Sequence, residues 1–257
     1  MLLIFGELYV ELKSTKNDRL LTTPGGALLR QAQSARAAGS RLRFLGRIGR
    51  DGFGHDIRAE MTAFEIETVL QEDSDNPSSL LLMTENEKIA YRAADAHLLP
   101  PSDAFFEGGS LLHAGSWIFG LDPGRTTATE IFREGLRRGL TLSLDLRVAR
   151  WAFRGDLEEV LRPYLPLGYM KIDAESAGAL GIKPGELFQW AGQVLYFDDK
   201  NVRRLSLFDE KSHRLPAGVS ADEVYGRFLA LVGSGEEAEV ALQAALKSLR
   251  ARKKAKE

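Results

Sequence analysis

The amino-acid sequence predicts an α/β fold in which helices cover both faces of a mainly parallel central sheet, with a small second β-sheet beside it. From residue 111 onward, short apolar segments typical of strands alternate with longer segments of helical character, the pattern of a parallel sheet with helical crossovers. Between residues 8 and 93, several short β-like segments break that alternation and predict the small sheet. We therefore expect one three-layer α/β/α domain over residues 1–257, with a lid formed by segments at about 8–23 and 67–93.

The first third of the chain begins with strands. An apolar segment from residue 2 and an alternating one from residue 8 predict two strands, and TTPGG at 22–26 predicts a turn. A helix is expected over 27–38, because Gly39 follows it and glycine commonly stands just past a helix C-terminus. Next come a predicted strand over 41–45, the glycine-rich segment GRIGRDGFG and a predicted helix to about residue 61.

The rest of the chain supplies the alternating elements. Asp122 and Pro123 are suited to the cap and first turn of a helix over 122–138. A β-hairpin is expected over 202–215, with its turn at 209–211. The remaining predictions are strands over 110–115, over 140–146, from residue 169 and from residue 194, and helices over 158–165, 221–231 and 236–253.

Composition restricts the class of function. The chain has 257 residues, of which 44% are hydrophobic and 27% charged, enough for one large domain with a buried core. A formal net charge of -2 gives no reason to expect nucleic acid or a membrane surface as a partner. The absence of cysteine excludes disulfides, thiolate metal sites and cysteine nucleophiles. The start of the chain lacks the features of a signal peptide and no apolar run has the length of a membrane span, so we expect a cytoplasmic protein.

Six segments, in order along the chain, resemble motifs of the ribokinase-type (PfkB) carbohydrate kinases. Segment 25–54 is similar to the GG turn, helix, glycine, strand and G-D-D-x-F-G-like loop of that family. The others are RAADAHLLPPSD (92–103), SLLHAGSWIFG (110–120), SLDLRVARW (143–151), YMKIDAESAGAL (169–180) and AGVSADEVYGRFLALV (217–232). The resemblance covers about residues 1–232, and it implies a ribokinase-like α/β/α domain with a small β-sheet lid.

The resemblance also implies a chemistry. Such kinases transfer a phosphoryl group from ATP, with Mg²⁺, to a hydroxyl of a small sugar that lies between the main sheet and the lid, and the lid often forms a homodimer interface. The catalytic base in the family is the aspartate of G-A-G-D, and Asp222 stands in its place. The main-chain N–H groups of Val219, Ser220 and Ala221 would then form the anion hole, since the N-terminus of a helix is a natural phosphate site. Otherwise, Asp222 is simply an acid in a first helical turn, where it suits the helix dipole.

The same resemblance places other residues near the acceptor sugar, namely Glu11, Gly25, Gly26, Arg30, Asp145 and Arg150. Arg30 stands where the family has a sugar-contacting asparagine. Arginine is larger and always charged, so it would either fill a sugar pocket or select an anionic ligand, such as a sugar acid. The alternative is that Arg30 is a solvent-facing helix residue.

Several positions depart from the family pattern. Residues with a Cβ replace the glycines of G-A-G-D, and a left-handed backbone there would cost about 1–2 kcal/mol. Loss of one anion-hole donor typically costs about 3 kcal/mol of transition-state stabilisation. Ser176 replaces a glutamate that helps to order magnesium in the family, and no residue is predicted as a metal ligand. The alternative hypothesis is therefore a catalytically impaired pseudo-kinase that binds a small molecule or a protein.

Overall fold

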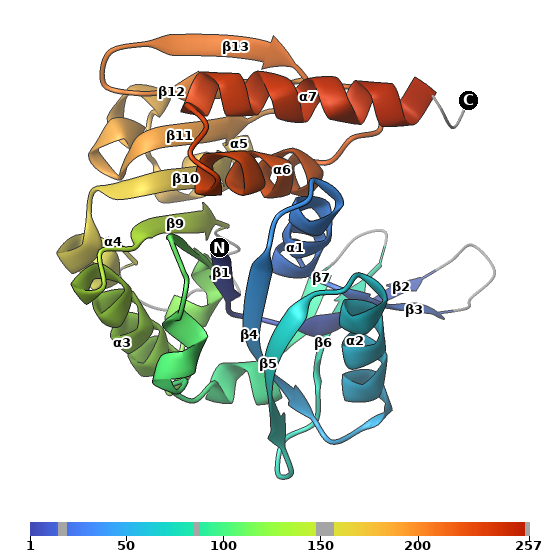
Figure 1. The fold of residues 1–257 in the computed structure, drawn as a ribbon. Helices are drawn as coiled ribbons and strands as arrows, with labels where there is room; N and C mark the ends of the chain where they lie inside the picture. The colour runs from blue at the N-terminus through green and yellow to red at the C-terminus, as the bar shows by residue number, and fades with distance from the viewer. Residues whose placement is uncertain (15–19, 85–87, 148–156, 255–257) are drawn as a thin grey trace.

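The computed structural model describes residues 1–14, 20–84, 88–147 and 157–254, and it places nine of their strands in one large sheet (Figure 1). In spatial order the strands are β13 (Glu210–Arg214), β12 (Asn201–Leu205), β11 (Ala191–Phe197), β10 (Leu167–Asp173), β9 (Thr141–Leu146), β8 (Leu111–Gly115), β1 (Leu2–Phe5), β4 (Leu42–Gly49) and β5 (Glu67–Asp73). The seven strands from β11 to β5 in this order are parallel, and β12 and β13 add an antiparallel hairpin at one edge.

Helices cover both faces of this sheet, as the alternation of elements predicts (Figure 1). Successive residues of a strand point to opposite faces, so β1 supplies Leu3 and Phe5 to one core cluster and Leu2 and Ile4 to the other. The first cluster includes side chains of α3 (Gly124–Arg137), α4 (Leu157–Leu161) and α5 (Ala174–Leu180). The second includes side chains of α1 (Ala27–Ala37), α2 (Gly52–Ala63), α6 (Ala221–Gly233) and α7 (Ala238–Lys254). The short 3-10 helices are η1 (Ala94–His97), η2 (Asp103–Phe106), η3 (Ser116–Phe119), η4 (Arg162–Tyr164) and η5 (Pro184–Gln189).

On the second face, α1 packs closely against α6. A Cβ built on Gly226 of α6 would lie 2.2 Å from the carbonyl oxygen of Gln31 on α1. Only a residue without a side chain lets the two helices approach this closely. The approach brings the middle of α1 next to the first turn of α6, where the predicted catalytic residue lies.

The small sheet has the order β3 (Leu20–Gly25), β2 (Tyr9–Ser14), β6 (Ser79–Met83) and β7 (Lys88–Tyr91). One of its contacts with the main domain is made by Tyr9, whose ring stacks on Trp117 with 5.7 Å between ring centroids. The segment predicted at 67–93 is only partly in this lid. Its first strand, β5, pairs in parallel register with β4 and belongs to the large sheet, because α2 returns the chain to that edge.

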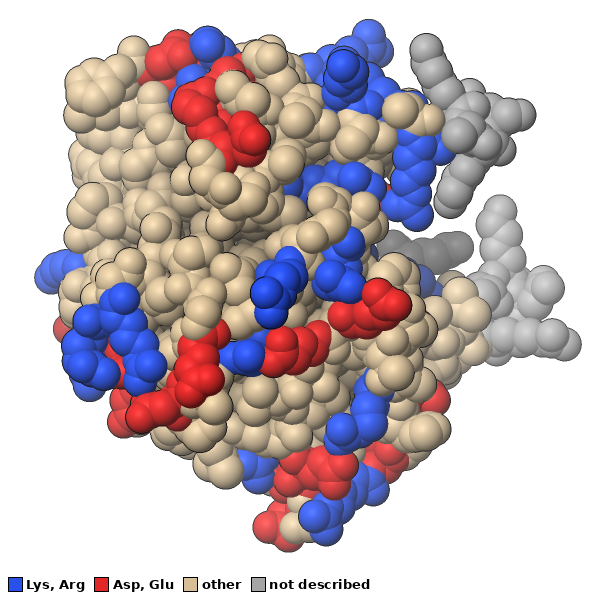
Figure 2. Space-filling view, in the orientation of Figure 1, with Lys and Arg blue, Asp and Glu red and all other residues tan. Residues whose placement is uncertain are grey.

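The turn predicted at 22–26 is wrong, because residues 22–25 belong to β3 and pair with β2 in the small sheet. The turn of the β12–β13 hairpin spans 206–209 rather than 209–211, and the remaining predicted elements form within a few residues of the expected ranges. On the face shown in Figure 2, acidic and basic side chains are interspersed, in keeping with the small net charge. Within the described residues, no helix combines the length and the apolar character that crossing a membrane requires.

Candidate active site

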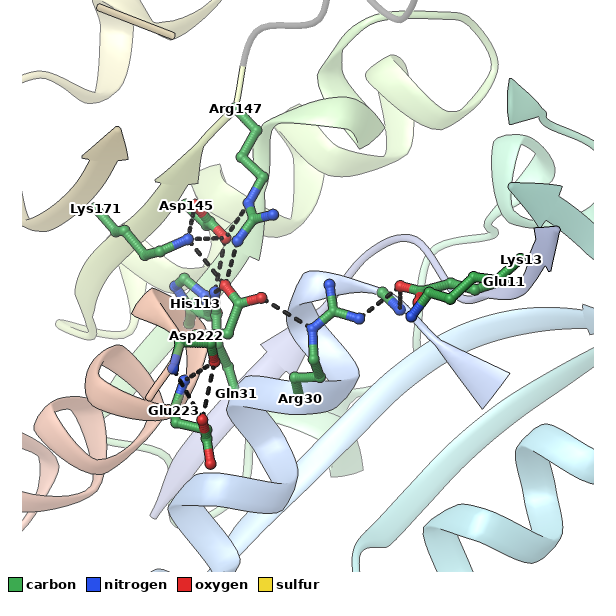
Figure 3. Close-up of polar contacts among 12 residues, drawn as sticks. Glu11, Lys13, Arg30, Gln31, His113, Asp145, Arg147, Lys171, Asp222 and Glu223 are labelled. Atoms are coloured by element: carbon green, nitrogen blue, oxygen red, sulfur yellow. Dashed lines mark hydrogen bonds and ion pairs between the residues drawn. The ribbon is translucent and has the colours of Figure 1, made fainter. Parts of the chain in front are cut away.

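Asp222 lies in the first turn of α6, at the edge of the sheet where the parallel strands end. Its side chain is buried, and four side chains donate to it (Figure 3). Arg30 Nε donates to Oδ2 at 3.0 Å. Lys171 Nζ at 3.0 Å, Gln31 Nε2 at 3.2 Å and Arg147 Nη2 all donate to Oδ1.

A second carboxylate, Asp145, shares three of these four donors. It stands near the end of β9, and the strand register places it beside Lys171 of β10. Lys171 Nζ donates to both Asp145 oxygens at 2.9 Å, and Gln31 Nε2 donates to Oδ2 at 2.6 Å. Arg147 Nε also donates to Oδ2, at 3.0 Å. Two carboxylates and three cations thus form one ion-pair cluster at the strand ends.

The cations keep both carboxylates ionised. Burial alone would raise the pKa of Asp222, but the charges of Lys171, Arg147 and Arg30 outweigh burial and hold that pKa far below its usual range. The pKa of Asp145 is likewise lowered, because Arg147 and Lys171 outweigh both its burial and the nearby charge of Asp222. Asp222 is therefore an anion whose proton affinity is suppressed.

Glu11 joins the lid to this cluster. Its Oε1 accepts from Arg30 Nη1 and, at 3.2 Å, from the main-chain N–H of Gly26. A Cβ on Gly25 would lie 2.5 Å from Glu11 Cγ, and Gly26 has a φ of 107°, so the glycine turn is required for this approach. Arg30 consequently bridges Glu11 of the lid and Asp222 of α6, and it is not a free solvent-facing residue (Figure 3).

A buried hydrogen-bond chain beneath the cluster was not predicted from the sequence. The side-chain amide of Gln31 donates to the two carboxylates through Nε2. Its Oε1 can only accept, so His113 Nε2 donates to it at 2.7 Å. The other ring nitrogen of His113 then accepts from Ser143 Oγ at 3.0 Å, and Tyr225 donates to Ser143 at 2.9 Å. Burial lowers the pKa of His113 to about 4, so the ring is neutral. The sequence hint was a histidine inside an apolar strand, next to an expected site.

Two of the three main-chain N–H groups of the predicted anion hole donate to acceptors within the protein. Gly218 has the left-handed backbone, with a φ of 73°, so Val219, Ser220 and Ala221 carry no such strain. The N–H of Val219 donates to the carbonyl of Pro216 at 3.2 Å. The N–H of Ser220 donates to the Glu223 carboxylate at 2.9 Å, while Ser220 Oγ accepts from the N–H of Glu223, which is a capping box.

The donor set does not fit a divalent metal ion held by the protein. Both carboxylates of the cluster are already bound by cationic side chains. Asp173 is the N-cap of α5, where it accepts from the N–H of Ser176 at 2.7 Å. No group of three or more His, Asp or Glu side chains suited to a metal ion occurs in the described parts of the chain. The positive charge at this site comes instead from Lys171, Arg147 and Arg30.

The structure thus gathers Glu11, Gly25, Gly26, Arg30, Asp145 and Asp222, as the family resemblance implies. Arg150 lies outside the described residues. Lys171, Arg147 and Gln31 were missing from the predicted site, although each contacts both carboxylates.

The comparisons with known proteins agree with the fold. A fructokinase from Halothermothrix orenii superposes with a TM-score of 0.81 at 19% sequence identity, covering 96% of each chain. The fructokinase of Vibrio cholerae O395, in its fructose-, ADP- and calcium-bound form, gives 0.84 at 19% identity over 97% of this chain and 90% of that one. The aminoimidazole riboside kinase of Salmonella enterica gives 0.79 at 16% identity over 95% and 89%. No family model and no curated protein matches the sequence. The ribokinase-like fold is confirmed, and at these identities the likeness concerns the fold alone.

Proposed function

We propose that the protein transfers the γ-phosphoryl group of ATP to a hydroxyl of a small sugar or sugar acid. The observation that carries the proposal is the Asp222 carboxylate at the start of α6, surrounded by Lys171, Arg147 and Arg30. Phosphoryl transfer needs a group that accepts the hydroxyl proton and fixed positive charge near the transferred group, and this cluster contains both. That two of the compared proteins are fructokinases supports a sugar acceptor.

In this mechanism, the acceptor oxygen forms a bond to the γ-phosphorus while the bond from phosphorus to the ADP oxygen breaks. The hydroxyl proton passes to Asp222. Lys171 stabilises the negative charge on the transferred group, a role that a preorganised donor in a dry site performs well. Glu11 accepts hydrogen bonds from sugar hydroxyls, at the glycine turn where Gly26 already binds it.

The test is product formation. Purified protein is incubated with ATP, Mg²⁺ and a panel of neutral and acidic monosaccharides, and the sugar phosphate is identified by mass spectrometry. Asp222→Asn should abolish product, whereas Glu72→Gln, which changes an exposed ion pair with Arg50 and Arg58, should not. A product that Asp222→Asn forms at the wild-type rate would remove Asp222 as the base.

One observation favours a second function, ligand binding without transfer. The capping box of Ser220 and Glu223 engages N–H groups that would otherwise face a phosphate, and three cations restrain Asp222. Under this hypothesis a small anion raises the melting temperature and ATP does not, because only a ligand that binds the folded state stabilises it. Stabilisation by ATP together with an Asp222-dependent product decides for the kinase.

A further inference from the structure

The charges of the site are layered. The carboxylates lie inside: the side chains of Glu11, Asp145 and Asp222 are 5%, 1% and 5% exposed. The side chains of Arg30 and Arg147 are more exposed to solvent, at 36% and 30%. Lys13, which pairs with Glu11, is also half-exposed, while Lys171 is buried. A molecule that approaches the cluster therefore meets guanidinium groups before it meets any carboxylate.

The cluster also has one positive charge in excess. The ion pairs of the cluster extend to Glu11 and Lys13, so the paired anions are Glu11, Asp145 and Asp222, and the paired cations, one more in number, are Lys13, Arg30, Arg147 and Lys171. The charge of Asp173 also acts on Arg147, but the Asp173 side chain caps α5. Because the excess charge lies on the outer layer, the cluster is electrostatically complementary to an anion and not to a neutral polyol.

We propose that the acceptor sugar carries an anionic group, a carboxylate or a phosphate, which binds Arg30 and Arg147 and replaces Asp222 as their partner. The proposal rests on the function proposed above and specifies its substrate class. Arginine suits this role because its planar guanidinium binds carboxylate and phosphate groups through two parallel hydrogen bonds.

The contacts of Asp222 show why the exchange matters for the reaction. Oδ1 accepts from three donors, two of which, Lys171 and Gln31, are buried. Oδ2 is held by Arg30 Nε, from a half-exposed side chain that can turn toward a ligand. Oδ2 is thus the oxygen that ligand binding can free for the hydroxyl proton. Neutralising Arg30 and Arg147 also removes two of the charges that suppress the proton affinity of Asp222.

A neutral sugar cannot make the same exchange. It would have to separate Arg30 from Asp222 without offering a charge in return, leaving a guanidinium and a buried carboxylate less well paired. The ion-pair cluster therefore discriminates against neutral sugars even where their hydroxyls fit.

The experiment measures anion binding directly and does not need turnover. Titration calorimetry at constant ionic strength compares galacturonate with galactose, and glucose 6-phosphate with glucose, and uses inorganic phosphate as a minimal probe. We expect at least one anion to bind about tenfold or more tightly than its neutral counterpart, the size expected for one charge-assisted contact. Arg30→Met and Arg147→Met should each abolish the preference. Arg137→Met is the matched control, because it removes a guanidinium from an exposed pair with Glu134 on α3.

Each outcome decides the proposal. If wild type binds none of the anions, or if both arginine variants retain the preference while remaining folded by circular dichroism, the proposal is wrong. If one variant fails to fold, the other still decides. Arginine-dependent anion binding without any phosphorylated product supports the anion site and contradicts the proposed transfer. Faster phosphorylation of a neutral sugar than of its acid, unchanged in Arg30→Met, supports the transfer and contradicts the anion site.

Discussion

Replacing Asp222 by Asn tests whether the ion-pair cluster stabilises the fold. The substitution keeps an acceptor oxygen and the shape of the side chain but removes one charge from between Lys171, Arg147 and Arg30. Removing one partner of a buried ion pair usually lowers the free energy of unfolding by about 3–5 kcal/mol. Lys171 keeps Asp145 and Arg30 keeps Glu11, so the loss should fall at the lower end, about 3 kcal/mol. For a chain of this size, that corresponds to a melting temperature lower by roughly 6–12 °C.

The pH dependence of this loss has a definite sign. The pKa of Asp222 is lower in the folded chain than in the unfolded one, so its contribution to stability is present above the unfolded pKa of about 3.9. The contribution is lost as pH falls through the folded pKa. The difference in melting temperature between wild type and Asp222→Asn should therefore be constant from about pH 7 to pH 5 and shrink in more acidic solution.

Thermal unfolding followed by circular dichroism measures this difference. Glu72→Gln is the control, because the pairs of Glu72 with Arg50 and Arg58 are exposed, and such pairs contribute about 0–1 kcal/mol. Equal stability of Asp222→Asn and wild type at pH 7 would mean that the cost of desolvating the buried charges cancels their attraction. The claim that the cluster stabilises the unliganded protein would then be refuted.

Four further substitutions test the burial of a charge, the packing of helices and the cap of α6. Burial raises the pKa of Glu7 from 4.5 to about 7, so the folded chain holds this proton more tightly than the unfolded chain does. The free energy of unfolding of wild type should therefore fall by about 3 kcal/mol as the pH rises from about 4.5 to about 7, and that of Glu7→Gln should not. Equal pH profiles of the two proteins would contradict this. Gly226→Ala should lower stability by about 1–3 kcal/mol, because its Cβ would collide with Gln31, whereas Gly178→Ala, with open space around it, should raise stability by about 0.5–1 kcal/mol. A neutral Gly226→Ala in thermal unfolding would show that α1 and α6 can separate. Ser220→Ala should cost about 1 kcal/mol in urea unfolding by removing the N-cap of α6, and no loss would show that the capping box is not formed.

The parallel character of the main sheet was predictable because it follows from a local pattern, whereas the gathering of the site was implied by the family resemblance. Apolar segments that alternate with helical ones predicted the parallel strands. Asp145 and Asp222 were expected together only because each matches a motif of the ribokinase-type family. Glu11 and Arg30 were likewise expected from the family resemblance, and the structure links them directly.

What the sequence did not predict depends on contacts between distant elements. Gln31 reaches the carboxylates because α1 lies against α6 at Gly226, and no local pattern specifies that approach. The hydrogen-bond chain through His113 depends on that same approach. The place of β5 in the large sheet was missed for a related reason, since a half-buried edge strand has the same short apolar pattern as a strand of the lid.

A last prediction follows from the competition between Asp222 and a ligand for the same arginines. If an anion binds Arg30 and Arg147 by replacing Asp222, then Asp222→Asn removes the internal competitor, although it destabilises the fold. The variant should therefore bind inorganic phosphate more tightly than wild type, by about tenfold, the size of one lost charge-assisted contact. Calorimetric titration of both proteins at equal ionic strength measures the difference, and Glu72→Gln should match wild type. A variant that binds phosphate more weakly than wild type would show that Asp222 does not compete for the arginines, because a purely structural role predicts that disrupting the cluster weakens every ligand.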